Sequence, residues 1–183
     1  MLGYFDLSER VAVVTGASRG LGLAMAEALA EAGATVVLNG RDANTLKAAA
    51  DRIRNRGLNA ETSAFDVTDR SAADSAIRSV VTRHLRLDIL IANAGVTHRA
   101  QLADWTSEAW DTVLEANLKA CFFLAQAAAA PMRSQGHGRI IFTTSALGIL
   151  GRPTVHAYAA SKRWGNRPAF LWIAERLGCC ASG

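Results

Sequence analysis

Short apolar runs alternate along the chain with longer segments in which alanine and leucine recur at helical spacing. The runs, such as RVAVVT and RIIFTT, have the length of buried strands, and glycine or polar residues close them. The predicted strands are residues 10–15, 35–38, 60–65, 88–92 and 139–144. The predicted helices are residues 20–32, 42–56, 69–84 and about 106–134, with a last one beginning near His156.

This alternation predicts βαβ units and a doubly wound parallel sheet of the α/β class, with helices on both faces. Sheets of that kind bind ligands beyond the carboxyl ends of their strands. The unusual residues do follow the strands. A glycine-rich segment follows the first strand, and the residues after the next four are Arg41, Asp66, Asn93 and Ser145. We therefore expect a single dinucleotide-binding domain over residues 1–183.

Composition and charge exclude several function classes. The chain has 183 residues, half hydrophobic and a fifth charged, and a net charge of only 20 − 16 = +4. No dense Lys/Arg run points to nucleic acid, and no Cys/His spacing points to a metal site. The N-terminus lacks the features of a signal peptide, and the most apolar run, residues 120–132, is too short for a bilayer. We expect a cytoplasmic protein with a small-molecule substrate and no nucleic-acid or membrane partner.

The glycine-rich segment TGASRGLG lies between the first strand and the first helix. Gly16 permits a tight exit from the strand, Gly20 lets the backbone approach a pyrophosphate, and Gly22 lets the helix pack close to the sheet. The helix N-terminus offers unpaired N–H groups to phosphate. An ordinary turn can carry such glycines, but this placement favours a dinucleotide site. The expected cofactor-binding residues here are Gly16, Ser18, Arg19, Gly20, Leu21 and Gly22.

The segment after the second strand bears on the choice of coenzyme. Sites that prefer NAD usually have an Asp or Glu there to accept from the ribose 2′-OH, and the sequence LNGR has neither. Arg41 instead offers a forked cation suited to a 2′-phosphate, and Arg19 could bind the same phosphate. Each arginine alone could be a solvated surface charge. Together they favour NADP, with NAD as the alternative.

A tyrosine and a lysine four residues apart, Tyr158 and Lys162, share one face of the last predicted helix. A nearby ammonium favours the phenolate form of a tyrosine, which can then exchange a proton with an alcohol or carbonyl oxygen. This pair alone is a weak signal. Ser145, at the end of the fifth strand, strengthens it, because its hydroxyl can bind the substrate oxygen.

Together the motifs resemble the short-chain dehydrogenase/reductase family in order and spacing, over roughly residues 5–162. The residues that carry the resemblance are TGASRGLG, Asp66-Val67, Asn93-Ala94-Gly95, Asn117, Ser145, Tyr158 and Lys162. One departure is Ala92, where the family more often has a second Asn. The resemblance implies a Rossmann-type fold and a nicotinamide-dependent oxidoreductase that interconverts a secondary alcohol and a ketone.

The resemblance also assigns residues to roles. Asn117 would anchor a water in a proton relay with Lys162. The implied catalytic residues are Asn117, Ser145, Tyr158 and Lys162. The implied cofactor-binding residues are Asp66 and Val67 at the adenine, then Asn93, Ala94, Gly95, Tyr158 and Lys162.

Three loop stretches, LNGR, THRA and RPT, look like the gluconate 5-dehydrogenase branch of the family. His98, Arg99 and Arg152 would lie near the pocket, where they can hydrogen-bond the hydroxyls and carboxylate of a polyol or sugar acid such as gluconate. Ser145 and Tyr158 complete the expected substrate contacts. The three loop residues could equally have no ligand contact. A 3-oxoacyl-thioester reductase shares nearly every motif and is the alternative.

The family pattern stops after Lys162. Residues 163–183 form an atypical tail, in which Gly165 and Pro168 oppose continuation of the helix. We interpret this tail as a truncated or frame-shifted end that leaves the fold incomplete and the nicotinamide side of the pocket open. The expectation is coenzyme binding with weak or absent turnover, and the alternative is a catalytically inactive nucleotide-binding remnant. With an intact C-terminal part, the apolar helices would resemble the family's dimer interface and imply a homo-oligomer, either a dimer or a tetramer.

Overall fold

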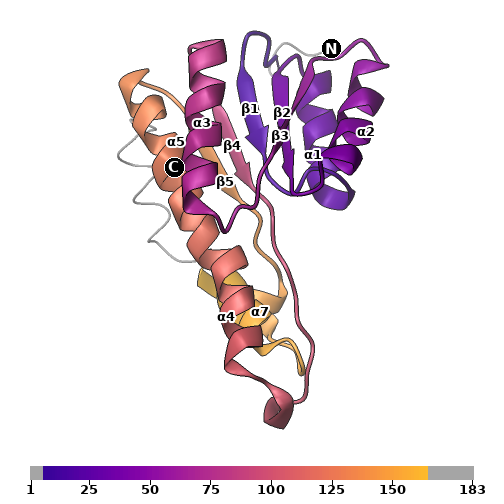
Figure 1. Ribbon diagram of the computed structural model, residues 1–183, viewed down its shortest axis with the longest axis vertical. Helices are drawn as coiled ribbons and strands as arrows, with labels where there is room; N and C mark the ends of the chain where they lie inside the picture. Colours follow the sequence, from indigo (N-terminus) through magenta and orange to yellow (C-terminus); the bar gives the residue numbers. More distant parts are fainter. Residues whose placement is uncertain (1–5, 165–183) are drawn as a thin grey trace.

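The computed structural model describes residues 6–164, which form one parallel sheet flanked by helices (Figure 1). The strands are β1 (Val11–Val14), β2 (Thr35–Gly40), β3 (Ala60–Ala64), β4 (Ile89–Ala92) and β5 (Arg139–Phe142). They pair in the order β3-β2-β1-β4-β5, so the strand order reverses between β1 and β4. The predicted doubly wound α/β sheet is confirmed, and a reversal of this kind opens a crevice at the carboxyl ends of the strands.

The helices follow the strands as the alternation predicts. The longer helices are α1 (Gly20–Glu31), α2 (Ala43–Arg54), α3 (Arg70–His84), α4 (Ser107–Leu114), α5 (Ala120–Ser134) and α7 (His156–Trp164). Shorter pieces are η2 (Leu102–Asp104), the π-helical η3 (Glu115–Lys119) and α6 (Leu147–Leu150). The tail prediction for residues 165–183 lies outside the described residues.

Alternating side chains of the strands build two cores, one on each face of the sheet. On one face, side chains such as Val14 and Leu38 pack against α1 and α2, which contribute Ala26 and Leu46. On the other face, residues such as Val13 pack against α3 and α5; the helical members include Ile77, Val80, Leu124 and Met132. Figure 1 shows these two helix pairs on opposite sides of the strands. The sheet therefore holds its strand ends on a rigid, two-sided support.

Side-chain caps set where several helices begin. Asp42 accepts from the backbone N–H of Thr45 at 2.7 Å, and Asp69 accepts from that of Ala72 at 3.0 Å. The first helix differs, because its cap residue Arg19 makes no side-chain capping hydrogen bond. The N–H groups of its first turn are therefore left to a ligand or to water.

The longest helical run joins α4, η3 and α5 without a break. Among the residues that the structure describes, this run, Ser107–Ser134, is long and apolar enough to cross a membrane by length and composition. It is longer than the apolar stretch expected from sequence, because the polar α4 continues directly into α5. Its inner side chains Leu124, Ala128 and Met132 are fully buried in the core beside the sheet. We therefore attribute its apolar character to the core.

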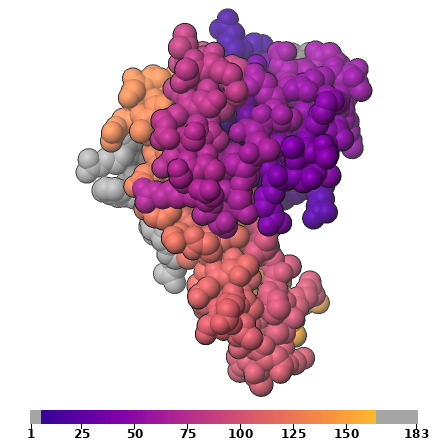
Figure 2. All heavy atoms as spheres, in the orientation of Figure 1, coloured from indigo at the N-terminus to yellow at the C-terminus, as the bar shows by residue number. Residues whose placement is uncertain are grey.

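A lobe made of α4, α6, α7 and the loops around them extends away from the sheet (Figures 1 and 2). Aromatic rings meet edge to face around Trp105, with His98 at 5.0 Å, His156 at 5.9 Å and Trp110 at 6.2 Å between ring centroids. The Trp105 indole also donates to the carbonyl of Ala100 at 3.1 Å. These contacts join the loop after β4 to the first turn of α7.

A buried carboxylate, Asp88, lies just before β4, at the amino ends of the strands, and accepts hydrogen bonds from residues of two segments of the chain. Asp88 is 4% exposed and accepts from Arg86 at 2.7 Å, from Arg10 at 3.1 Å and from the backbone N–H of Val11 at 2.9 Å. His137 adds a contact at 2.8 Å. Burial alone would raise the pKa of Asp88, but these hydrogen bonds outweigh it and hold the pKa well below its usual range.

The ends of the strands differ slightly from the prediction. The second strand extends to Gly40 rather than residue 38, because Asn39 and Gly40 still have partners on β3. The fifth strand ends at Phe142 rather than residue 144, because its last partner is Ala92, where β4 ends. The prediction did not include the short helices η2 and α6. In the described part of the chain β5 lies at a sheet edge, as expected.

Candidate active site

A cleft of about 540 Å³ opens at the carboxyl ends of the strands. Figure 2 shows the molecule hollowed between the sheet-bearing part and the lobe. The residues predicted for cofactor binding that line the cleft are Gly16, Ser18, Arg19, Arg41, Asp66, Val67, Asn93, Ala94 and Gly95. Gly20, Leu21 and Gly22 begin α1 beside it. Tyr158 and Lys162, which complete the predicted cofactor-binding set, are not among the lining residues.

The glycine loop packs closely against the loop that follows β4. Gly16 has φ = +63°, and a Cβ there would lie 2.9 Å from the Cα of Ala94. At Gly22 a Cβ would overlap the carbonyl oxygen of Gly16 and lie 2.6 Å from the Asn93 Nδ2 atom. Only glycine fits both positions, so the backbone itself forms the floor of the cleft.

Changing Gly22 to alanine is expected to destabilise the fold by about 2 kcal/mol through overpacking. Because the floor of the cleft must shift, we also expect the Kd for NADPH to rise more than tenfold, on the order of the 1.4 kcal/mol that a decade represents. Urea unfolding and fluorescence titration measure the two effects. Gly57→Ala is the matched control, since Gly57 has positive φ but open space around it. Equal losses of NADPH affinity in the two variants would contradict the claim that the close packing at Gly22 shapes the coenzyme site.

A buried threonine and an asparagine fasten the glycine loop to the loop after β4. The Thr15 hydroxyl accepts from the backbone N–H groups of Asn93 and Ala94, each at 3.0 Å. The Asn93 amide in turn donates to the carbonyls of Thr15 at 3.0 Å and Gly16 at 3.3 Å. Sequence reasoning assigned Asn93 to this region but missed the part that Thr15 plays.

The far end of the cleft, beyond β2, carries charge of both signs. Arg41 is 75% exposed and its guanidinium lies 3.9 Å from a carboxylate oxygen of Asp66. A backbone hydrogen bond from Thr68 to Asp66 lowers the pKa of that carboxyl, and Arg41 adds to the effect. Beneath them the buried Asn39 amide donates to the carbonyls of Ser63 and Phe65. A negatively charged ligand here would therefore meet Arg41 at the rim of an ordered wall.

Asn117 lies in the π-helical segment η3, a break that is frequent at functional sites. It is 4% exposed, and its amide accepts from the N–H of Val96 at 2.7 Å and donates to the Val96 carbonyl at 2.9 Å. It also donates to the Ser161 hydroxyl at 3.1 Å. Asn117 therefore connects the long helix, the loop after β4 and α7.

Lys162 lies where the cleft, η3 and β5 meet. Its side chain is 6% exposed, and its ammonium donates to the Thr143 carbonyl at 2.7 Å. The ammonium lies 5.9 Å from the centre of the Tyr158 ring and 3.8 Å from where a Cβ on Gly95 would be. Burial lowers the pKa of Lys162. Gly95 is thus the point at which the cleft reaches Lys162 and the half-buried Tyr158.

Ser145 is half-buried between β5 and α6, where its hydroxyl accepts from the backbone N–H of Leu147 at 3.2 Å. Ser145, Tyr158 and Lys162 are not among the residues that line the cleft, which Lys162 approaches at Gly95. A separate small cavity of about 20 Å³ is bounded by residues that include Asn117 and Lys162. Its volume suits one water molecule.

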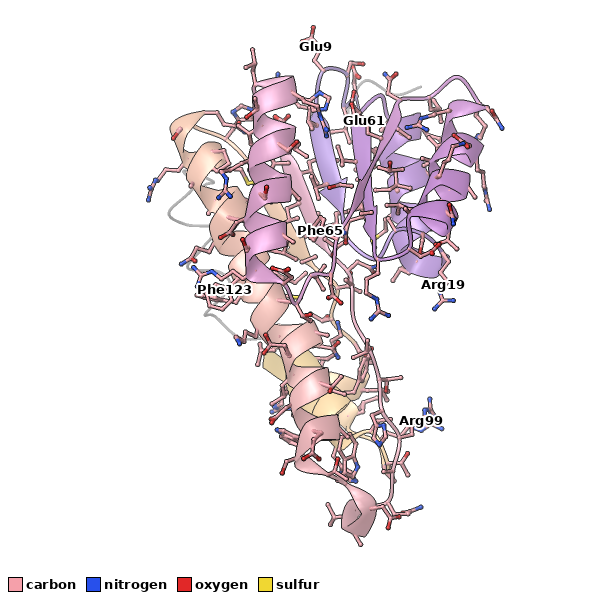
Figure 3. All side chains as sticks on the ribbon, in the orientation of Figure 1. Glu9, Arg19, Glu61, Phe65, Arg99 and Phe123 are labelled. Carbon is pink, nitrogen blue, oxygen red and sulfur yellow. The ribbon has the colours of Figure 1, made fainter. Side chains whose placement is uncertain are left out.

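The residues predicted to bind substrate lie on the lobe, outside the main cleft. His98 is exposed and meets Trp105 edge to face. Arg152 is exposed in the loop after α6. Figure 3 shows Arg99 extending from the lobe on the same side of the molecule as Arg19. None of the three residues is among those that line the cleft.

Several lining residues were not among the predicted site residues. They are Asn39, Gly40, Phe65, Thr68, Val96, Thr112, Glu115 and Ala116. Those from α4 and η3 reach the cleft only because the long helix crosses it. Phe65 and Thr68, which follow β3, could have been found by extending the rule that ligands bind beyond strand ends.

The sequence profile of the short chain dehydrogenase family matches residues 10–166. The chain belongs to this family. Among its relatives, the gluconate 5-dehydrogenase of Gluconobacter oxydans is 42% identical over 158 residues, which are 86% of this chain and 62% of that enzyme. The 3-oxoacyl-[acyl-carrier-protein] reductase of Escherichia coli is 36% identical over 153 residues, which are 84% of this chain and 62% of that enzyme. This short chain dehydrogenase thus spans less than two thirds of these relatives' length.

A solved structure of the same family resembles the fold closely. The gluconate 5-dehydrogenase of Burkholderia cenocepacia, in complex with NADP and tartrate, superposes with a TM-score of 0.88 at 37% identity. The match covers 95% of this chain and 69% of that one. The predicted family and its gluconate 5-dehydrogenase-like character are confirmed.

Proposed function

We propose that the chain is an NADP-dependent oxidoreductase that interconverts a secondary alcohol and a ketone. One observation carries the proposal: the buried ammonium of Lys162 lies about one helical turn from Tyr158 and adjoins Gly95, which lines the cleft. A buried ammonium is costly even when it is hydrogen-bonded, and such groups cluster at functional sites.

The residues present fit a nicotinamide dinucleotide. Gly20, with φ = +59° and open space around it at the start of α1, lets the backbone approach a pyrophosphate, and Gly16 and Gly22 hold the loop against Asn93 and Ala94. The start of α1 lacks a side-chain cap, and arginines stand at the rim. When bound, the coenzyme supplies or accepts a hydride at its nicotinamide ring. We infer that Asp66 and Val67 hold the adenine and that Asn93, Ala94 and Gly95 lie along the nicotinamide half.

The chain's own residues handle the proton. In the reducing direction, Tyr158 gives its hydroxyl proton to the carbonyl oxygen, and in the oxidising direction it takes a proton from the alcohol. Lys162 stabilises the resulting phenolate by its charge. Ser145 donates its hydroxyl hydrogen to the substrate oxygen, where charge develops. Asn117 and the small cavity behind Lys162 support a water through which the proton is replaced from solvent.

NADP is the proposed coenzyme rather than NAD, because Arg41 and Arg19 both line the cleft. We expect Arg41→Ala to raise the Kd for NADPH about thirtyfold, the size of a lost hydrogen-bonded charge pair, and to leave NADH binding unchanged. Fluorescence titration with both coenzymes measures the difference. Arg56→Ala, which removes an exposed arginine paired with Glu31, is the control. The NADP assignment is wrong if NADPH and NADH lose affinity equally.

The proposed substrate class is a polyol or sugar acid such as gluconate. Two relatives named for gluconate 5-dehydrogenase activity support it, one of them in complex with tartrate, a hydroxylated dicarboxylate. His98, Arg99 and Arg152 have side chains suited to hydroxyl and carboxylate groups. The second candidate is a 3-oxoacyl-thioester reductase, which the 36% identity to the Escherichia coli enzyme favours.

A substrate panel with excess protein and NADPH tests the proposal. We expect 5-ketogluconate to be reduced faster than 3-oxoacyl thioesters. Faster reduction of the thioesters would contradict the sugar-acid proposal and favour a 3-oxoacyl-thioester reductase. NADPH binding without reduction of any ketone would instead identify a nucleotide-binding protein without catalysis.

We further propose a cytoplasmic setting and, for a chain with an intact C-terminal part, a homo-oligomer, either a dimer or a tetramer. The exposed face of α5 supports the second point. Phe122 on that helix is 37% exposed, and Phe123 lies beside it under the Arg70 guanidinium. Light scattering on the purified protein measures the assembly.

A further inference from the structure

We propose that Thr143 is a positioning residue that couples the glycine loop to Lys162. The inference rests on the proposed function, since it concerns how the coenzyme floor and the proton-handling lysine are held in register. Thr143 contacts both of these parts at once. Its hydroxyl donates to Asn93, which holds the glycine loop, and its carbonyl accepts from Lys162.

The carbonyl of Thr143 holds the lysine. The Lys162 ammonium donates to this oxygen at 2.7 Å, and the side chain around it is nearly fully buried. A charge-assisted hydrogen bond of this length is strong and directional. The position of the Thr143 peptide group therefore sets the position of the ammonium relative to Gly95 and Tyr158.

The hydroxyl of Thr143 holds the loop after β4. It donates to the Asn93 Oδ1 atom at 3.3 Å, while the Nδ2 group of the same amide donates to the carbonyls of Thr15 and Gly16. The Asn93 amide can satisfy these partners in one orientation only, because its nitrogen must face the two carbonyls and its oxygen must face the Thr143 hydroxyl. Thr143 thus favours the orientation in which Asn93 fastens the glycine loop.

The hydroxyl matters here because the strand ladder has ended. The last paired residues of β4 and β5 are Ala92 and Phe142, and beyond them Thr143 keeps a single backbone bond, from its N–H to Ala92 at 3.2 Å. The side-chain bond to Asn93 is the second point that fixes the Thr143 peptide. Valine has nearly the same shape as threonine but no hydroxyl, so Thr143→Val removes the hydrogen bond to Asn93 with little change in packing.

The test compares Thr143→Val with Thr143→Ser, which keeps the hydroxyl, and with Thr82→Val, which removes an exposed hydroxyl on α3. Three quantities are measured: NADPH affinity, the single-turnover rate at saturating NADPH and 5-ketogluconate, and exchange of the Asn93 side-chain amide protons by NMR without coenzyme. For the valine variant we expect about fivefold weaker NADPH binding, a fivefold lower rate and fivefold faster exchange, the size of one hydrogen bond.

Thr143→Ser and Thr82→Val are expected to match the unmodified chain in all three measurements. A serine variant as impaired as the valine variant, or a valine variant with unchanged Asn93 exchange, overturns the proposal. If the unmodified chain neither binds NADPH nor reduces a ketone, the proposed function fails. The Asn93 exchange rates then still decide the coupling, since they need neither coenzyme nor turnover.

Discussion

Replacing Tyr158 by phenylalanine is expected to lower the single-turnover rate of ketone reduction about thousandfold, within the usual range for losing a general acid. The ring and its packing beside Lys162 remain, while the proton that the carbonyl oxygen must receive is gone. NADPH binding should be nearly unchanged, because Tyr158 is not among the residues that line the cleft and only its hydroxyl is removed. Rapid mixing with protein in excess over coenzyme measures the rate directly.

The control for this experiment lies on the same helix. Ala160→Ser changes an exposed position of α7 and should leave both rate and affinity unaltered. A Tyr158→Phe variant that reduces ketones at the rate of the unmodified chain would remove the proton donor from the proposed chemistry, whatever the coenzyme does.

Asp88→Asn is expected to lower the free energy of unfolding by about 3 kcal/mol, because it leaves buried donors facing a neutral amide. The melting temperature should fall by about 9 °C for a chain of this size. The effect is large because Asp88 is 4% exposed and joins Arg10, Arg86 and Val11. Asp104→Asn, at an exposed position of η2, is the matched control. Equal melting temperatures for both variants would contradict this role.

The same carboxylate predicts a pH dependence. The pKa of Asp88 is lower in the folded chain than in the unfolded chain, where it is about 3.9. Its contribution is therefore fully present above that unfolded value and is lost as the pH falls below it. We expect the stability gap between the unmodified chain and Asp88→Asn to stay constant from neutral pH down to about pH 5 and to narrow below about pH 4. Urea unfolding across this range measures the gap, and a gap that widens in acid would contradict the assignment.

The sequence predicted the sheet, because short apolar runs alternate with helical segments and glycine marks the turns. It also predicted the glycines of the loop, because Gly16 and Gly22 lie between a strand and a helix, although the contacts with Asn93 and Ala94 that exclude a Cβ are tertiary. Arg41 and Asp66 follow from the rule that ligands bind beyond strand ends, and both line the cleft.

Other parts depend on tertiary contacts that no local pattern encodes. The π-helical turn at Asn117 arises where the long helix meets Val96 and Ser161, residues far away in the sequence. The same is true of the bond from Thr143 to Asn93, which spans fifty positions. His98 has side-chain chemistry suited to a substrate, but its neighbour in the fold is Trp105. Residue type alone did not reveal that contact.

Transfer of a labelled hydride tests the central claim most directly. The purified protein, in excess, is mixed with NADPH carrying deuterium at C4 of the nicotinamide ring and with 5-ketogluconate, and the product is examined by mass spectrometry. The predicted result is a product alcohol with deuterium at the newly formed carbinol carbon. Saturation of the cleft by NADPH without deuterium in any product, from this ketone or from the rest of the panel, would contradict the claim.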